Sequence, residues 1–136
     1  MLEQAPQPST KPRNSKAPTQ DYIHVTIRTT IPAAQKHAAV VTLRSMIEQI
    51  KLEEGCLGCR LYQDLQNTDA LMLEAAWSEE ILLQRYLASD QFHTVLLVIE
   101  MAVEPPEIRF ATVAHVSGLE TIEKARMHSG RYLPVE

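Results

Sequence analysis

The stretch LGCRLYQDLQNTDALMLEAAW, residues 57–77, contains two runs in which apolar residues alternate with polar or small ones. Alternation with a period of two is typical of a strand that buries one face. Residues 64–69, between the runs, are rich in Asp, Asn and Thr, which favour a turn. If that turn is centred near Asn67, Arg60 lies opposite Glu74, and Leu61 lies opposite Leu73. The stretch therefore predicts an antiparallel hairpin with one apolar face, to which the first run contributes Leu57, Cys59 and Leu61.

Outward from this hairpin, the spacing of apolar residues predicts five further elements. These are a strand at 22–28, a helix at 32–53, a helix at 78–99, a strand at 108–116 and a short helix from 117 to about 127. The second helix is predicted to start with Ser78 as its cap and to break near Ser89. The order predicts an α+β fold, a ferredoxin-like βαββαβ antiparallel sheet with both long helices on one face and an extra C-terminal helix.

Composition limits the class of protein. A chain of 136 residues with 45% hydrophobic residues suffices for one domain with its own core. The formal net charge is −4, so no basic surface for nucleic acid is expected. No apolar run is long enough for a secretory signal or a membrane span, and with only two cysteines a cytoplasmic location fits best.

The first 20 residues differ from the rest of the chain. They hold Lys11, Arg13 and Lys16 against Glu3 alone, and half of the eight prolines. Such a segment has too few apolar residues to offset the entropy cost of ordering. We therefore expect a disordered N-terminal tail at 1–20, a ferredoxin-fold domain at 21–116, and a C-terminal helix and tail at 117–136.

The cysteines and histidines offer only weak motifs. Cys56 and Cys59 form a C-x-x-C pair, but the pair leads into a strand, whereas thiols of the thioredoxin type open a helix. We interpret Cys59 as a core residue and Cys56 as partly exposed. The five histidines are scattered, and no two stand four apart, so no metal site is predicted.

Three segments carry a stronger signal, namely EGCLGCRLYQD at 54–64, EAAWSEE at 74–80 and LASDQF at 87–92. In these motifs the chain from Tyr22 to Val113 resembles the antibiotic biosynthesis monooxygenase family, a family of small dimeric α/β-barrel proteins. The resemblance implies a homodimer in which two sheets face each other, and an apolar pocket between each sheet and its own helices. The interface would carry His24, Arg28, Arg60, Tyr62 and Glu74, with Arg60 and Glu74 satisfying each other's charge.

The resemblance also implies a function, and the residues provide candidates for it. Some members oxygenate aromatic polyketides or quinols with molecular oxygen and without metal, flavin or other cofactor. Haem is disfavoured, since Leu96 stands near the position of the axial histidine of haem-degrading members. For a small aromatic, phenolic or quinol substrate, His93 or Tyr86 would transfer a proton and Arg85 would stabilise an anion. Substrate-binding candidates on the apolar faces are Trp77, Leu73, Leu61, Cys59 and Phe92.

Two alternatives remain open at this stage. The same fold could serve as a non-catalytic binding or regulatory module, which the many leucines at family site positions favour. A thiol-redox role for Cys56 and Cys59 is the third hypothesis. A cavity on the order of 300 Å³ with converging polar groups distinguishes an enzyme site from a closed core.

Overall fold

The computed structural model describes residues 21–130, and the predicted tail at 1–20 lies outside this range, as do residues 131–136. Its elements are β1 (Tyr22–Thr30), α1 (Ala33–Ile50), β2 (Cys56–Gln63), β3 (Ala70–Trp77), α2 (Glu80–Leu87), α3 (Asp90–Ile99), β4 (Glu107–Val113) and α4 (Leu119–His128). Residues 21–113 form one compact unit, and α4 belongs to a second. All buried residues of the described chain lie in the first unit.

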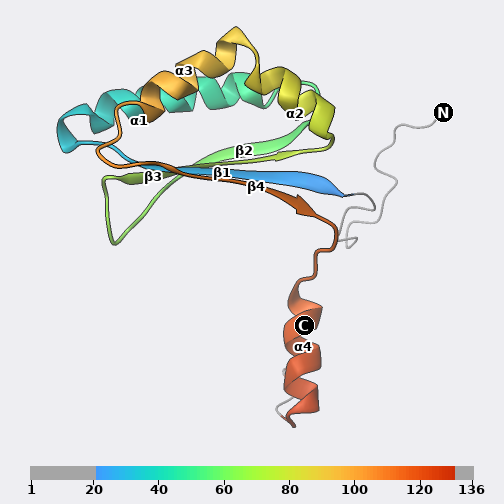
Figure 1. The fold of residues 1–136 in the computed structure, drawn as a ribbon. Helices are drawn as coiled ribbons and strands as arrows, with labels where there is room; N and C mark the ends of the chain where they lie inside the picture. Colours follow the sequence, from blue (N-terminus) through green and yellow to red (C-terminus); the bar gives the residue numbers. More distant parts are fainter. Residues whose placement is uncertain (1–20, 131–136) are drawn as a thin grey trace. The chain divides into compact units, whose positions relative to one another are not determined.

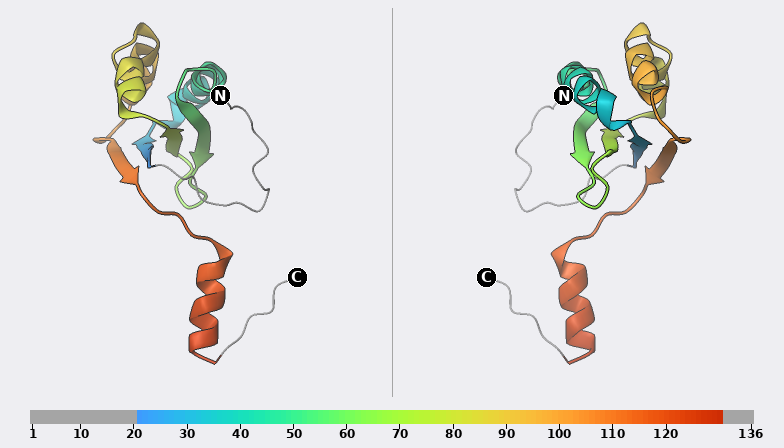
Figure 2. Two further views of the ribbon diagram at one scale, coloured as in Figure 1. Left: turned by 90° about the vertical axis from the view of Figure 1, so that its right-hand side faces the viewer. Right: turned by 90° about the vertical axis from the view of Figure 1, so that its left-hand side faces the viewer.

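The four strands form one antiparallel sheet in the order β2-β3-β1-β4. The helices α1, α2 and α3 all cover one face of this sheet (Figures 1 and 2). This arrangement confirms the predicted α+β ferredoxin-like fold. Within the described chain, β2 and β4 are the two sheet edges, and the sheet is not closed as a barrel.

The register of the β2–β3 hairpin is the predicted one. Arg60 pairs with Glu74, and Leu61 pairs with Leu73. The strand is irregular between Cys56 and Gly58, where a β-bulge adds one residue. Because of this bulge, Leu57 is exposed and Cys56 takes the position opposite Trp77. The expectation that Leu57 belongs to the apolar face, which the alternation alone suggested, is therefore wrong.

Helix boundaries follow local hydrogen bonding. Helix α1 ends at Ile50, three residues before the predicted end, because Leu52 and Glu53 donate to carbonyls three residues back and tighten the chain into a turn. The Ser89 Oγ accepts a hydrogen bond from the Phe92 amide and caps α3, which confirms the predicted break. Ser78 is not a cap: α2 starts one residue later than expected, with Glu79 at the N-cap.

Candidate functional site

The inner face of the sheet, the face that the helices cover, is organised in rows that run across the strands. One row contains Cys59, Ala75, Val25 and Phe110, which are neighbours from β2 to β4. Above the first three of these small side chains lies a cavity of about 30 Å³, enclosed by apolar side chains. Its other walls are Ile27, Leu73 and Trp77 from the sheet, Ile50 from α1, and Leu83, Tyr86, Leu87, Phe92 and Val95 from α2 and α3.

Three aromatic side chains surround this cavity and contact one another. The rings of Trp77 and Tyr86 stack with centroids 5.4 Å apart and an interplanar angle of 25°. Phe92 meets Tyr86 edge-on, with centroids 5.6 Å apart. Trp77 is only 2% exposed and Tyr86 6%. Aromatic pairs in these geometries add to the stability that burial alone provides, so the site is also part of the core.

The Tyr86 hydroxyl is the polar group of this site. It is buried, and no described residue forms a hydrogen bond with it. Burial raises the pKa of Tyr86, and the nearby Cys59, Glu53 and Cys56 act in the same direction. The hydroxyl is therefore neutral at physiological pH and can donate a hydrogen bond to a ligand oxygen. Leaving such a group unpaired costs about 1–3 kcal/mol, which a suitable ligand would recover.

The two thiols lie on the same side of β2 as the cavity, because the bulge brings Cys56 and Cys59 onto one face. Burial raises the pKa of Cys59 to about 12 and also raises that of Cys56. Both side chains are free thiols rather than a disulfide. Because the thiolate is the reactive form, this environment gives neither cysteine the properties of a nucleophile at neutral pH.

The other two catalytic candidates, Arg85 and His93, do not line the aromatic cavity. Arg85 is exposed and pairs loosely with Glu54, with 3.7 Å between Nη1 and Oε1. Arg85 and Tyr86 line a second, more polar hollow of about 370 Å³ together with Glu53, Glu54, Leu82, Ser89, Asp90 and Gln91. His93 is exposed on α3, beside Phe92 but not among the residues that line either space. The structure thus brings Tyr86 and Arg85 together and leaves His93 apart.

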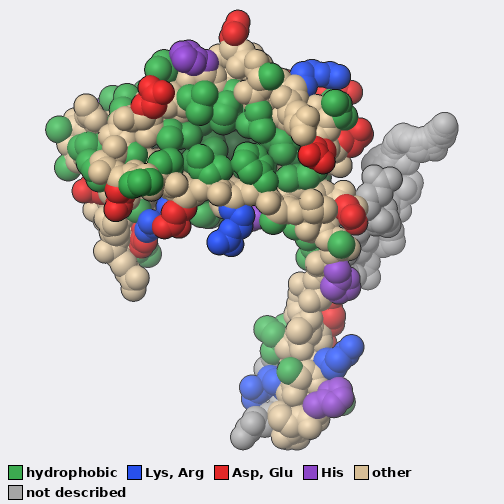
Figure 3. Space-filling model, viewed as in Figure 1, with side chains coloured by type: hydrophobic (Ala, Val, Ile, Leu, Met, Phe, Trp, Pro, Cys, Tyr) green, Lys and Arg blue, Asp and Glu red, His purple; other side chains and the backbone are tan. Residues whose placement is uncertain are grey.

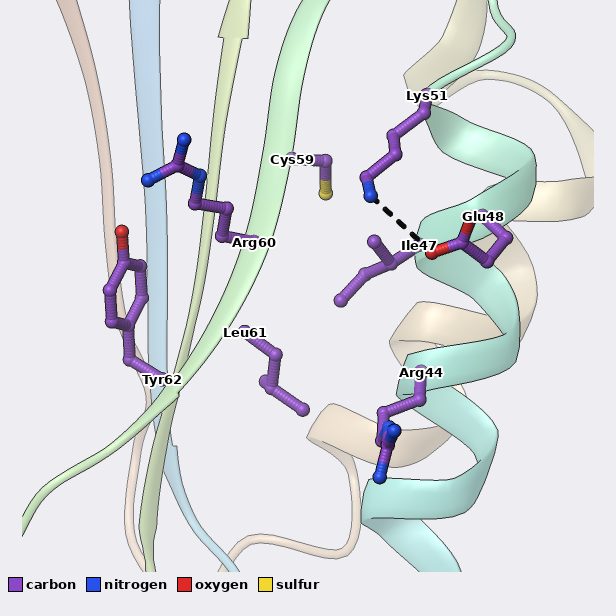
Figure 4. A pocket seen from close by; sticks show the side chains of 8 residues that line it. All are labelled: Arg44, Ile47, Glu48, Lys51, Cys59, Arg60, Leu61 and Tyr62. Atoms are coloured by element: carbon purple, nitrogen blue, oxygen red, sulfur yellow. Dashed lines mark hydrogen bonds and ion pairs between the residues drawn. The ribbon is translucent and has the colours of Figure 1, made fainter.

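Leu61 lies at the edge of the sheet, in an open groove of about 400 Å³ between β2 and α1. Figure 4 shows Cys59, Leu61 and Ile47 directed into the space between strand and helix, whereas Arg60 and Tyr62 project from the other side of β2. The rim carries Arg44 and the Lys51–Glu48 ion pair. This groove is larger than the aromatic cavity, but it is open and its rim is charged. The cavity at Tyr86 is therefore the better candidate for an apolar ligand.

The outer face of the sheet has a different chemistry. Glu74 accepts hydrogen bonds from His24 Nε2, at 2.8 Å, and from the Tyr62 hydroxyl, at 3.0 Å. The bond from His24 is the main cause that holds the pKa of Glu74 below its ordinary value. Arg28 pairs with Asp64 at 2.9 Å. The carboxylate partner expected for Arg60 is thus engaged by other groups, although Arg60 stands opposite it in the register.

Several wall residues were not identified from the sequence as site residues. Leu83, Leu87 and Val95 come from helices whose periodicity shows a buried face but not what that face contacts. Gly55 also matters, because its φ is +93° and an added Cβ would lie 2.7 Å from Leu82 Cδ1. This close approach positions the start of α2 over the turn before β2. Its signal in the sequence was a glycine soon after a helix.

In residues 21–130 there is no group of three or more His, Cys, Asp or Glu side chains that could hold a metal ion. No helix within the same range is both long and apolar enough to cross a membrane.

Comparisons with known proteins agree with this architecture. No curated protein matches the sequence. A conserved protein from Methanosarcina mazei Go1 is 26% identical, with a TM-score of 0.64 over 68% of this chain and 93% of that chain. Rv0793 from Mycobacterium tuberculosis (20% identity, TM-score 0.60, 72% and 98% covered) and an antibiotic biosynthesis monooxygenase (17%, 0.62, 70% and 99%) share the fold. The family model described as antibiotic biosynthesis monooxygenase matches residues 22–96, more than half of the chain. The chain therefore belongs to the antibiotic biosynthesis monooxygenase family.

Proposed function

We propose that this protein is a cofactor-independent monooxygenase that binds a small aromatic phenol or quinol beside Trp77, Tyr86 and Phe92. Family membership supports the reaction class. The observation that carries the site is the Tyr86 hydroxyl, a buried donor without a partner among the described residues, in an otherwise apolar cavity. A ligand oxygen would satisfy this hydroxyl, and the ligand ring would pack against the aromatic side chains.

The proposed reaction requires few functional groups from the protein. An electron-rich substrate that loses a proton can react with oxygen directly, so the site has to exclude water and stabilise the substrate oxygen. For an anthrone, the CH₂ group and O₂ give a C=O group and water, which balances without an external reductant. A neutral Tyr86 would donate to the developing oxyanion. Arg85, which lines the polar hollow with Tyr86, would attract the anion. His93 is exposed and lines neither space, so it would accept the proton only through solvent.

The experiment is oxygen uptake with a panel of quinols and anthrones. We expect faster uptake with wild-type protein than in buffer. In Tyr86→Phe the rate should fall by about a hundredfold or more, the usual size for removal of one hydrogen-bond donor to an oxyanion. Tyr62→Phe is the matched control, because Tyr62 lies on the outer face. Unchanged uptake in Tyr86→Phe would refute the assigned role. Unchanged rates in His93→Ala or Arg85→Ala would remove those residues from the mechanism.

A second function, a non-catalytic binding module, is favoured by one specific observation. The cavity holds about 30 Å³, far below the volume on the order of 300 Å³ expected for an enzyme site, and an engineered apolar cavity that binds benzene has about 150 Å³. A ring can enter only if side chains move or if part of the ligand lies outside the enclosed space. Binding of the phenols without oxygen uptake would establish the module and exclude the enzyme.

We also propose a homodimer through the outer sheet face, with His24, Arg28, Arg60, Tyr62 and Glu74 in the interface. These side chains are half-buried or exposed on one face, and no described helix of the same unit covers it. Sedimentation equilibrium should give twice the chain mass. Thr26→Arg would place a further cation opposite Glu74 and beside Arg109 at the centre of that face, and we expect it to favour monomers. A wild-type monomer at micromolar concentration would contradict the interface.

A further inference from the structure

The inner face of β4 is apolar, and no other element of residues 21–113 covers it. In the sheet register Phe110 is the neighbour of Val25, and Ile108 is the neighbour of Ile27. Both Val25 and Ile27 are buried walls of the aromatic cavity, each 5% exposed. Phe110 and Ile108 are about half exposed, at 51% and 49%. The wall of the cavity therefore continues onto β4, where the structure gives it no cover.

Figure 3 shows the consequence at the surface. Hydrophobic side chains gather in a hollow between the α2–α3 pair and β4. On α3, Phe92 lines the cavity, and Leu96, about one helical turn later, is 40% exposed. The cavity of about 30 Å³ and the apolar face of β4 therefore adjoin at β1, whose Val25 and Ile27 line the cavity and are the sheet neighbours of Phe110 and Ile108.

The row Cys59, Ala75, Val25 and Phe110 gives this surface a direction. The first three side chains are small, and Phe110 closes the row at the sheet edge. Neighbouring strands are about 4.8 Å apart, so the row spans roughly 14 Å across the sheet. Tyr86 lines the cavity together with Cys59, and it lines the polar hollow together with Glu53 and Glu54, which lie just before β2, so Tyr86 is at the β2 end of the row. The polar group and the exposed aromatic ring therefore mark opposite ends.

We propose that Phe110 is a specificity-determining residue, and that the preferred ligand is a neutral, linear arene of two or three fused rings with one terminal hydroxyl. The hydroxyl would bond to Tyr86, and the distal ring would lie in the hollow against Phe110 and Ile108. The cavity walls carry no charged side chain, which favours a neutral ligand. This inference rests on the proposed ligand site but does not require that the ligand is oxygenated.

The test is anaerobic titration with phenol, 2-naphthol and 2-anthrol, followed by quenching of Trp77, the only tryptophan in the chain. Without oxygen the measurement reports binding alone. We expect the Kd of the wild type to fall from one ring to three. In Phe110→Ala the Kd for 2-anthrol should rise about tenfold, in line with the loss of a buried ring contact, while that for phenol changes little. Phe110→Leu should keep part of the affinity.

Leu57→Ala is the matched control, because Leu57 is also exposed (59%) but lies on the bulge. Equal loss for phenol and 2-anthrol in Phe110→Ala, or no loss for either, would overturn the proposal. So would a change of sedimentation mass in Phe110→Ala, which would mean that protein rather than ligand covers β4. Selective binding without oxygen uptake would support this inference and refute the monooxygenase, so the two can fail separately.

Discussion

The inner and outer faces of the sheet are built from the same alternating strands, but they differ in how their polar groups are hydrogen-bonded. On the inner face, Trp77 and Tyr86 stack in an apolar space, and the Tyr86 hydroxyl has no hydrogen-bond partner in residues 21–130. On the outer face, every hydrogen-bonding atom of the Glu74 carboxylate has a partner, His24 on one oxygen and Tyr62 on the other. Thr29 Oγ1 is also buried without a partner among the described residues, but Thr29 does not line the cavity. The comparison teaches that unmet hydrogen bonding indicates a candidate ligand site where it coincides with a cavity.

The largest effect that separates the faces is expected from truncating the inner aromatic pair. Trp77 is 2% exposed and contacts the cavity, so Trp77→Ala should lower the free energy of unfolding by about 3–5 kcal/mol through lost burial and a new void. Tyr62→Ala, on the outer face, should cost about 1 kcal/mol or less, since it loses one exposed hydrogen bond. Urea denaturation followed by far-ultraviolet circular dichroism measures both. Similar losses of stability in Trp77→Ala and Tyr62→Ala would contradict the expected difference between the two faces.

A smaller effect is expected from the same substitution at two glycines, one in the turn before β2 and one within β2. Gly55 lies against Leu82 of α2, and Gly58 has nothing within 4 Å of an added Cβ. Gly55→Ala combines a clash with a positive φ, so we expect a loss of about 2 kcal/mol or more. Gly58→Ala should change the midpoint of denaturation little. If both variants were equally stable, the close contact at Gly55 would not position α2.

Tyr86→Phe should act in the opposite direction. Removing a buried hydroxyl that no described residue pairs with is expected to raise the free energy of unfolding by about 1 kcal/mol, because the folded state then no longer buries it unpaired. The matched Tyr62→Phe should be neutral or slightly destabilising, since that hydroxyl bonds to Glu74. Thermal melting of the two variants beside the wild type shows whether each substitution raises or lowers the stability. A destabilised Tyr86→Phe would mean that the hydroxyl is satisfied in solution.

The smallest effect concerns pH and the outer face. The pKa of Glu74 is held below its ordinary value, mainly by the bond from His24, so its contribution is present above its unfolded pKa. It is lost as pH falls through the lower folded pKa. Glu74→Gln should therefore be less stable than wild type at pH 7, by less than about 1 kcal/mol for a partly exposed pair. Well below pH 4 the two melting curves should converge, and Glu104→Gln, an exposed control, should follow wild type throughout.

Sequence patterns predicted the fold well because they report on neighbours in the sheet. The hairpin register followed from matching apolar side chains across a turn, and the Ser89 break followed from a local cap. The prediction for Leu57 was wrong because a β-bulge changes the face on which a residue lies without changing the composition of the strand. Alternation also placed Ile108 and Phe110 in a strand, but could not show that the helices leave this strand uncovered.

The candidate site was predictable only in part. Trp77, Leu73, Cys59, Tyr86 and Phe92 line one cavity, as expected for apolar residues on facing elements. Leu61 lines the edge groove, and the exposure of Arg85 and His93 depends on how the helices are rotated over the sheet. The absence of a partner for Tyr86 among the described residues depends on atoms from several elements, which no short sequence window contains.

Because of the bulge between Cys56 and Gly58, the strand pairing depends less on the number of residues in this segment than on the residue pairs on either side of it. The pairs on either side of it, Cys56 with Trp77 and Gly58 with Ala76, are consecutive in β3, so Leu57 is a one-residue insertion relative to a regular strand. A homologue without a residue at this point would keep every row of the inner face intact. A structure-based alignment with a regular strand therefore needs a gap at Leu57. With that gap, the two cysteines of the C-x-x-C pair occupy successive positions on the inner face of β2.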